Sequence, residues 1–548
     1  MNWLTPFSAV RERVLPRDQV LSLGQLAVLG ALVGGLAGLA ISALHWLIDA
    51  GRTLLAPAQE RMADSHSAAT EAFVITAGGA LLLGLLFQLF KPRRREGGFV
   101  HIIERLTYHQ GQFPFINVVL QFLGTAIATV THQAVGREGA SAHMGAAAGS
   151  WLGTRLDIPT ASVRTLVGCG AAAGIAASFN TPLAGVIFIM EVIVVEYSVA
   201  SLAPSIVAAV CANAVAHLWL QSHPALVATD SALASMTELP FLALMGIVIG
   251  LLARLYLDVA GQATLRMRRW PAWVAMTAVG LVTGAGAVAA SGLVDNGFDV
   301  INSALGAELD MKTAATLAAL MLLCSALAIA AGLPGGVIMP CMLSGACIGL
   351  VIGLTATMVM STPISPPGVY ALLGLGAMLA AVLQAPLTAL VLLVELSSRT
   401  DILLPAMMVV IAAVLTARQP NRAASVFALV LRNRGLDYRN DPISQSLRRI
   451  SVMAAMNRHI ARCPSTLSLT KARELLAKHP EWLLITPESG PRLALPAADL
   501  LHACNSVAQE SDHADDTSTV IDLTKIPGDR RRLGTIHLRA SAVLADDW

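Results

Sequence analysis

Two glycine-rich stretches contain the residues of this sequence that could do chemistry. Gly136-Arg137-Glu138-Gly139 lies between an apolar segment and an Ala/Gly-rich run that could form a helix, and residues 335–340 read Gly-Gly-Val-Ile-Met-Pro. Glycine lets a backbone turn sharply and approach a ligand closely. A helix that begins just after such a turn points unpaired N–H groups outward, with partial positive charge. Both stretches therefore predict anion sites without a full positive charge, which favours release as well as binding.

Glu138 is the unusual residue of the first stretch. A carboxylate at membrane depth is costly and indicates a functional site by default. Beside helix N-termini the carboxylate would compete with a permeant anion for the same dipoles, and protonation would end that competition. This predicts a pH-sensitive gate made of one residue. The alternatives are a salt bridge to Arg137 and a role as a first-turn cap.

An internal repeat indicates how these stretches are positioned. AASFNTPLAGVIFIME (176–191) matches AAVLQAPLTALVLLVE (380–395), so that Pro182 pairs with Pro386 and Glu191 with Glu395. Three glycines further upstream also recur, 200 residues apart: Gly136 with Gly336, Gly145 with Gly345, and Gly149 with Gly349. The alternative is chance similarity between Gly/Ala/Leu-rich segments, but the proline and glutamate matches are not compositional. The sequence therefore predicts a duplicated membrane half, with inversion of the halves as a hypothesis.

The composition indicates that most of the chain is surrounded by lipid. Of 548 residues, 55% are hydrophobic and 13% are charged, about half the ~25% typical of soluble domains. The mean hydropathy is +0.66. A net charge of +2 gives no indication of nucleic-acid binding. The seven cysteines are scattered without a CxxC, so neither a disulfide framework nor a metal site is predicted.

The apolar segments predict an all-α membrane protein. Arg11, Arg13 and Arg17 precede an apolar run too long for a signal peptide, which predicts a first membrane helix after a cytoplasmic segment 1–20. Many segments are short or interrupted by Gly or Pro, as in transporters whose half-helices meet near the midplane. They lie at about 22–48, 69–90, 114–135, 142–155, 163–195, 198–220, 238–262, 271–292, 312–331, 334–360, 369–395 and 401–417.

These motifs resemble the CLC family of chloride channels and proton/chloride antiporters. The family's GREGP appears as GREGA (136–140), its GxFxP as GVIMP (336–340), and residues 171–192 follow its most recognisable stretch. The resemblance covers residues 21–432, with repeat halves at about 21–220 and 238–418. It implies an inverted-repeat bundle of broken and tilted helices, a homodimer with one anion pathway per subunit, and two cytoplasmic termini.

The resemblance also implies the functional residues. Glu138 would be the gate, and the backbone N–H groups of Val337 and Ile338 would contact the central anion. The anion pathway would be lined at these positions: Gly97, Gly98, Gly136, Arg137, Gly139, Gly336, Val337, Ile338 and Phe427.

Several positions depart from the family pattern. In the GSGIPE motif, matched to residues 96–101, Gly97 stands where a chloride-binding serine is usual. Phe427 stands where the pore tyrosine is usual and has no hydroxyl, so the central site is expected to be weaker or wetter. Val192 replaces the inner proton-transfer glutamate of the antiporters and cannot relay a proton. Valine there is characteristic of the family's channels, although other proton routes through water or a displaced acid stay open.

The sequence also predicts roles for Glu191 and His143. Glu191 is expected to be structural, buried and hydrogen-bonded near the subunit interface or a helix end. His143 stands where a glutamine is common. It could make the gate pH-dependent near neutrality, or it could be a hydrogen-bonded helix histidine.

The tail, residues 445–548, resembles a CBS domain. Residues 452–503 predict the order strand, helix, strand, turn, strand, helix, with the turn at Pro487–Gly490. What remains, Val520–Leu523 and Gly534–Leu538, is short for a second module, which is expected to be incomplete. Dimer stabilisation or regulation is expected rather than nucleotide binding.

The sequence therefore predicts a passive, acid-sensitive chloride channel of the cell membrane. The alternative is a proton/chloride exchanger without the inner glutamate. The sequence contains no HExxH motif, no GxSxG motif and no paired aspartates in an apolar segment, so none of these motifs indicates an enzyme. No cofactor or metal is implied either. Chloride, lipid and a second copy of the chain are the expected partners, with protons in the exchanger alternative.

Overall fold

The computed structural model contains two compact units, residues 1–439 and 440–548. It describes residues 21–60, 65–195, 198–219, 235–289, 297–359, 365–418, 425–436, 460–486, 493–510, 520–523, 526 and 531–532. The expected cytoplasmic segment 1–20 lies outside these residues.

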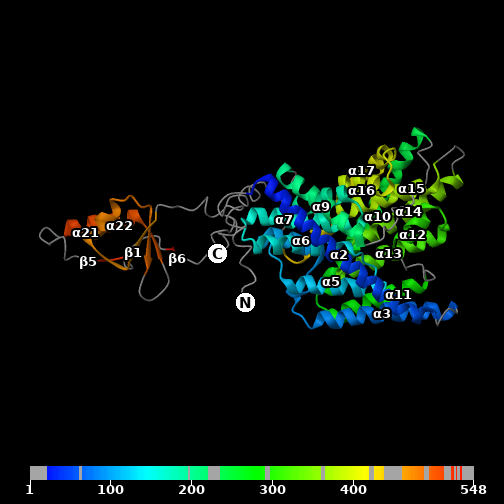
Figure 1. Cartoon of the computed structure of the whole chain (residues 1–548), viewed down its shortest axis with the longest axis horizontal. Coiled ribbons are helices and arrows are strands. Elements are labelled where there is room, and N and C mark those ends of the chain that lie inside the picture. The colour runs from blue at the N-terminus through cyan, green and yellow to red at the C-terminus, as the bar shows by residue number, and fades with distance from the viewer. Residues whose placement is uncertain are drawn as a thin grey trace. The chain divides into compact units, whose positions relative to one another are not determined.

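The first unit is helical (Figure 1). Its first half runs α2 (Leu23–Glu60), α3 (Ser65–Gln88), η1 (Pro92–Arg94), α4 (Gly98–Tyr108), α5 (Phe115–Val130), α6 (Glu138–Arg155), α7 (Thr160–Phe179), α8 (Pro182–Phe188), η2 (Ile189–Val194) and α9 (Val199–Trp219). Its second half runs η3 (Met236–Glu238), α10 (Leu239–Met267), α11 (Ala272–Ala289), α12 (Gly297–Leu305), α13 (Met311–Ala331), α14 (Ile338–Val359), α15 (Pro367–Leu383), α16 (Pro386–Ser397), α17 (Leu403–Ala417) and α18 (Val426–Asn433).

Several of these helices can cross a membrane. Seven helical segments within the described ranges are long and apolar enough to do so, which agrees with a multi-pass membrane protein. They are Leu23–Leu55, Thr70–Gln88, Thr160–Phe179, Ala200–Trp219, Leu239–Met267, Met311–Ala331 and Ile338–Val359. The shorter apolar helices, such as α5 and α16, confirm the expectation of broken segments.

The repeat predicted from the sequence is visible in the backbone. The apolar runs 163–195 and 369–395 each break where one residue takes the left-handed conformation, Asn180 at φ 57° and Gln384 at φ 56°. The next residues, Thr181 and Ala385, have φ of −130° and −129°. A proline then opens the following helix in each half, where its missing N–H costs nothing.

Glycines let equivalent helices pack closely in both halves. A Cβ on Gly170 would collide with the backbone of Gly145, and a Cβ on Gly374 would collide with that of Gly345. Such contacts between small residues are the usual way for membrane helices to approach each other. The α6–α7 pair of the first half therefore recurs as the α14–α15 pair of the second.

The second unit contains the α/β order expected for the tail, with one strand more before the first helix than the sequence predicted. β1 (Ile460–Pro464), β2 (Thr466–Ser468), α21 (Leu469–Leu476), β3 (Trp482–Thr486), β4 (Leu493–Pro496), α22 (Ala497–Glu510), β5 (Val520–Asp522) and β6 (Arg531–Arg532) follow in sequence. β1 pairs in parallel with β3, and β3 in antiparallel with β4. The late strands complete this unit, since β5 pairs with β2 and β6 with β4. The expected turn 487–490 and segment 534–538 lie outside the described residues.

Candidate functional site

The two glycine-rich stretches meet each other directly. The Gly136 N–H donates to the Gly336 carbonyl at 2.8 Å, and the Gly336 N–H donates to the Gly136 carbonyl at 2.5 Å. This isolated bridge is antiparallel, as a local two-fold axis between the halves would make it. α6 and α14 begin two residues after their respective glycines. The repeat therefore brings two helix N-termini to one place.

Glu138, the first residue of α6, is fully buried at this bridge. A Cβ on Gly136 would collide with the Glu138 carboxylate, and a Cβ on Gly336 would lie 2.7 Å from its Oε2. The carboxylate therefore rests against both loops, and only glycine fits at either position. The backbone N–H of Met339 lies close enough to interact electrostatically, although neither carboxylate oxygen has a partner with full hydrogen-bond geometry.

Arg137 is the residue before α6, and it does not neutralise Glu138 by direct contact. Its charge acts on the carboxylate at longer range, and the described residues include no ion pair between the two. The side chain of Arg137 does not cap α6 either. The salt bridge considered from the sequence is therefore not among the described contacts, and neither carboxylate oxygen of Glu138 makes the hydrogen bond that the alternative role as a cap would need.

A cavity of about 200 Å³ opens beside Glu138. The cavity lies between four parts of the chain, which are helix α2, the loop that precedes α6, helix α12 and the start of helix α14. Arg52 and Arg137 contribute positive charge to its wall and Asp299 negative charge. The other lining residues are Thr129, His132, Gln133, Ala134, Val135, Gly136, Glu138, Gly297, Phe298, Met321, Met339, Pro340 and Leu343.

A third loop joins the site before α4. Gly97 precedes α4 without a side-chain cap, and Gly98 has φ +67°, a conformation that favours glycine. A Cβ on Gly98 would lie 3.4 Å from the Gly335 carbonyl, and one on Gly139 would collide with that same carbonyl. The N-termini of α4, α6 and α14 therefore converge, with Val337 and Ile338 buried at the start of α14.

An aromatic trio packs beside these loops. The Phe99 ring of α4 lies 4.9 Å from the ring of Phe188 and 5.2 Å from the ring of Phe427. This contact brings the start of α18 to the start of α4. Phe427 is buried and offers only its ring there. The structure thus brings the three glycine-rich loops together and joins Phe427 to the start of α4 through the Phe99 ring, and Phe188 is an addition that the sequence reasoning missed.

The inner proton position is occupied by an apolar side chain. Val192 is buried in the π-helical turn η2, which packs against α4, α7 and α8. Its neighbour Glu191 points elsewhere, and its carboxylate accepts hydrogen bonds from the N–H groups of Leu387 (3.1 Å) and Thr388 (2.8 Å) and from the Thr388 hydroxyl (2.6 Å). The expected hydrogen-bonded role at a helix end is therefore confirmed, although Glu191 is half-buried rather than buried.

Glu395 makes the equivalent contacts in the other half. Its carboxylate accepts hydrogen bonds from the N–H groups of Leu183 at 2.9 Å and Ala184 at 2.7 Å. Each half thus caps the first turn of a helix of the other half, α16 by Glu191 and α8 by Glu395. Caps of this kind satisfy N–H groups that a helix leaves open.

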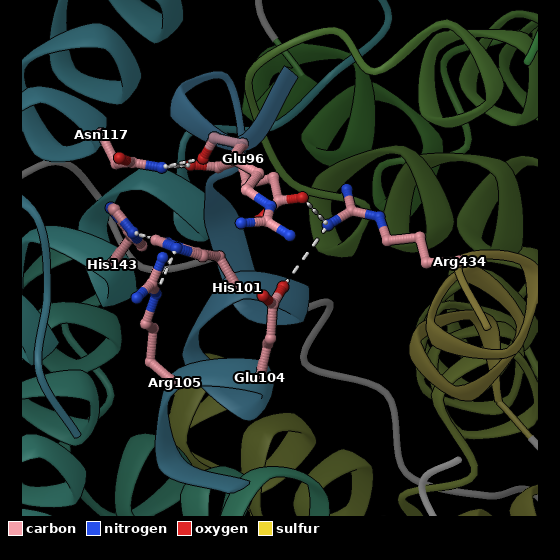
Figure 2. A network of polar contacts seen from close by, with 8 residues as sticks. Glu96, His101, Glu104, Arg105, Asn117, His143 and Arg434 are labelled. Carbon is pink, nitrogen blue, oxygen red and sulfur yellow. Dashed lines mark hydrogen bonds and ion pairs between the residues drawn. The ribbon is translucent and has the colours of Figure 1, made fainter. Parts of the chain in front are cut away.

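A polar network that the sequence did not reveal surrounds α4 (Figure 2). On one side, Arg105 Nε donates to His101 Nε2 at 2.8 Å, and His101 Nδ1 lies 2.8 Å from His143 Nε2. On the other side, Arg434 pairs with Glu96 at 3.5 Å and with Glu104 at 3.8 Å.

The Arg105 contact fixes the protons of the two histidines. A guanidinium can only donate, so a neutral His101 must carry its proton on Nδ1 and donate it to His143. His143 then carries its own proton on Nδ1, a buried atom with no hydrogen-bond partner among the described residues. A further proton on His101 would have to displace Arg105. His143 is therefore hydrogen-bonded within the helix bundle, as the second of the two alternatives expected, and an effect on the pH dependence of the gate stays a prediction.

Comparison with known proteins agrees with this geometry. The family described as voltage gated chloride channel matches residues 79–418, more than half of the chain and both halves of the repeat. The chain belongs to this CLC family. A ClcB-like chloride channel protein of Ralstonia nicotianae is 30% identical over 68% of this chain and 88% of its own length. A relative from Salmonella paratyphi A, named as the H(+)/Cl(-) exchange transporter ClcA, is 25% identical over 74% of this chain and 89% of its own length.

Solved structures show the same fold. A eukaryotic CLC transporter superimposes with a TM-score of 0.66 at 21% identity, covering 88% of this chain and 89% of its own. CLC membership carries anion transport across a membrane as the general activity. The relatives' names include both a channel and an exchanger, so the mode of transport is a separate question.

Proposed function

We propose that this CLC protein conducts chloride passively and that protonation of Glu138 opens the pathway. The observation that carries the proposal is the buried Glu138 carboxylate, which rests against the paired Gly136 and Gly336 loops at the starts of α6 and α14. An anionic side chain there competes with a permeant anion for the same N–H groups. Protonation removes the negative charge by which the Glu138 side chain is attracted to these N–H groups.

Val192 supports passive conduction over exchange. The family's antiporters usually carry a proton-transfer glutamate at this position, and an isopropyl side chain cannot relay a proton. The aromatic trio of Phe99, Phe188 and Phe427 lies close by and adds no titratable group.

Coupled proton/chloride exchange is the second candidate. Glu138 itself can carry a proton, and the 25% identical relative is named as an exchange transporter. The two modes differ in what accompanies chloride, since an exchanger moves protons in a fixed ratio and a channel does not.

Chloride efflux from liposomes tests the proposal. Purified protein would be reconstituted into vesicles loaded with potassium chloride, and efflux would be started with valinomycin while external chloride and pH are recorded together. Passive conduction predicts chloride release that is faster at acidic pH and moves no protons. Release accompanied by proton uptake in a constant ratio would contradict the channel mode, and absence of release at every pH would contradict anion transport.

We further propose that the protein is a homodimer in the cell membrane with both termini in the cytoplasm, as its resemblance to the family implies. The tail would stabilise or regulate this dimer. Its late strands β5 and β6 pair with β2 and β4 of the CBS-like unit, which leaves the described part without a second module that could share a nucleotide. Titration with ATP is expected to give no heat of binding.

A further inference from the structure

Two membrane-length helices end close to each other, and basic residues lie at both ends. The spans formed by α3 and α10 end at Gln88 and Met267. The Gln88 side chain accepts a hydrogen bond at 3.0 Å from the backbone N–H of Ala272, the first residue of α11. The end of α3 therefore lies beside the turn from α10 to α11, and Figure 1 shows α3 and α11 next to each other.

Six exposed cations gather at these two helix ends, and we call them the basic surface. They are Lys91, Arg93 and Arg94 after α3, and Arg266, Arg268 and Arg269 at the end of α10. Neither segment 89–95 nor segment 262–273 contains an acidic residue. Within the described part of the chain, none of the six belongs to an ion pair. Their positive charge is therefore available to an anionic partner.

The backbone that carries the first three cations is held in place. Arg95 Nε donates to the Phe90 carbonyl at 2.6 Å, just after the end of α3. The buried Asn117 amide donates to the Arg93 carbonyl at 3.0 Å and to the Glu96 carbonyl at 2.9 Å (Figure 2). A partner that binds these cations therefore does not have to order the turn first, which lowers the cost of binding.

Exposed apolar side chains border the basic surface. Leu85 and Leu89 lie at the end of α3, and Trp270 and Trp273 lie at the turn into α11. Tryptophan is enriched where the hydrocarbon of a membrane meets water. These four side chains therefore place the basic surface at the level of the lipid headgroups.

We propose that the basic surface binds the phosphate headgroup of an anionic phospholipid such as phosphatidylglycerol. Guanidinium groups match phosphate oxygens with paired N–H donors, and basic clusters just beyond a membrane helix attract anionic lipids. Cations that only orient a helix in the membrane need not converge from two helices, as they do here. The proposal goes beyond the proposed anion transport and does not depend on it.

Native mass spectrometry of the full chain in an uncharged detergent tests the proposal. Phosphatidylglycerol and phosphatidylcholine would be titrated into wild type, into Arg93→Gln/Arg94→Gln and into the control Arg155→Gln/Lys312→Gln. The control removes two exposed charges at the end of α6 and the start of α13. Wild type and control are expected to prefer phosphatidylglycerol. The test variant is expected to bind it about thirtyfold more weakly, about fivefold for each cation removed.

A second variant tests whether both helix ends contact one headgroup. Arg266→Gln/Arg269→Gln removes two charges from the end of α10 and is expected to weaken binding by a similar factor. Thermal unfolding without added lipid should be the same for this variant, for Arg93→Gln/Arg94→Gln and for wild type, because all four side chains are exposed. A loss confined to one of the two variants would contradict a shared headgroup site.

Tryptophan fluorescence locates the bound lipid. Brominated phosphatidylglycerol in vesicles of phosphatidylcholine should quench the wild-type protein more than brominated phosphatidylcholine does at the same content. Trp270→Phe/Trp273→Phe should lose this excess of quenching. Trp46→Phe, at an exposed position of α2, is the control and should keep it.

The opposite results overturn the proposal and leave the proposed anion transport intact. They are equal binding of the two lipids by wild type, phosphatidylglycerol binding unchanged in Arg93→Gln/Arg94→Gln, or an equal loss in the control. Displacement of the lipid by inorganic phosphate at the same concentration would indicate a site for free phosphate and would also overturn it. Excess quenching kept in Trp270→Phe/Trp273→Phe would place the lipid elsewhere.

Discussion

The Glu138 carboxylate can lie where it does only because two neighbouring positions are glycines. Gly136 and Gly336 are far apart in sequence, yet each must be glycine for the carboxylate to lie against their paired backbones. The motif around Glu138 predicted its place beside helix N-termini, because glycine allows the sharp turn and the close backbone approach that such a place needs. The contacts of α5 were not predictable in this way, since nothing in the spacing of Gln121 and Gly97 indicates that they touch.

Replacing the gate should remove pH dependence. Glu138→Gln is isosteric with the protonated carboxyl, so we expect chloride efflux that varies by no more than about twofold between about pH 4.5 and 7.5. Wild type should accelerate on acidification over the same range. Glu308→Gln, an exposed carboxyl on the described surface, is the matched control and should behave as wild type does. Retained pH dependence in Glu138→Gln would show that another group is the gate.

Glu96 gives a prediction for stability rather than transport. Burial raises the pKa of its carboxyl above the ordinary value, more than the nearby Arg434 lowers it. A raised pKa in the folded state means that stability is lost as pH rises through that pKa. Relative to Glu96→Gln, wild type should therefore unfold at progressively lower temperature as the pH rises from the ordinary carboxyl range to neutrality. A difference in melting temperature that stays constant or changes in the opposite direction would refute this.

At the scale of the helices, the two halves of the repeat show which elements the sequence predicted and which it did not. The sequence match predicted the duplication and paired Pro182 with Pro386, but it did not predict that these prolines open helices and placed no break inside the runs 163–195 and 369–395. The breaks depend on one left-handed residue each, Asn180 and Gln384, and single residues of this kind leave no periodic signal. The short helices α4 and α12, of 11 and 9 residues, were missed because neither forms a long apolar run.

The crossed helix caps should be needed for stability in both halves. Glu191→Ala removes three hydrogen bonds to the start of α16, and Glu395→Ala removes two at the start of α8. We expect each to lower the free energy of unfolding by about 1–3 kcal/mol, with the larger loss for Glu191. Thermal unfolding of the detergent-solubilised variants measures this. A variant Glu191→Ala that is as stable as wild type would argue against the capping role.

At the scale of the whole molecule, the two-fold relation of the halves places the site at their contact. Helix N-termini from α4 and α6 of the first half and from α14 of the second half meet there. The sequence predicted this convergence through the repeat and the family resemblance. The polar network around α4 depends on tertiary contacts between residues up to 338 positions apart, Glu96 and Arg434, and was not predictable from local pattern.

Restoring an inner carboxyl should not by itself produce an exchanger. Val192→Glu places an acid at the inner position, but Gly97 and Phe427 still lack the hydroxyls that are usual beside it. We expect chloride flux without a fixed proton ratio in this variant, measured by simultaneous chloride and pH recording. A constant exchange ratio would mean that Val192 alone sets the transport mode.

The central claim is passive chloride conduction, and the zero-current potential tests it most directly. Purified protein in liposomes would be placed under a chloride gradient, and the potential recorded while an opposing pH gradient is imposed. The proposal predicts a potential that follows the chloride gradient alone and does not move with pH difference. A potential shifted in proportion to the pH gradient would show that protons are coupled to chloride and would contradict the account.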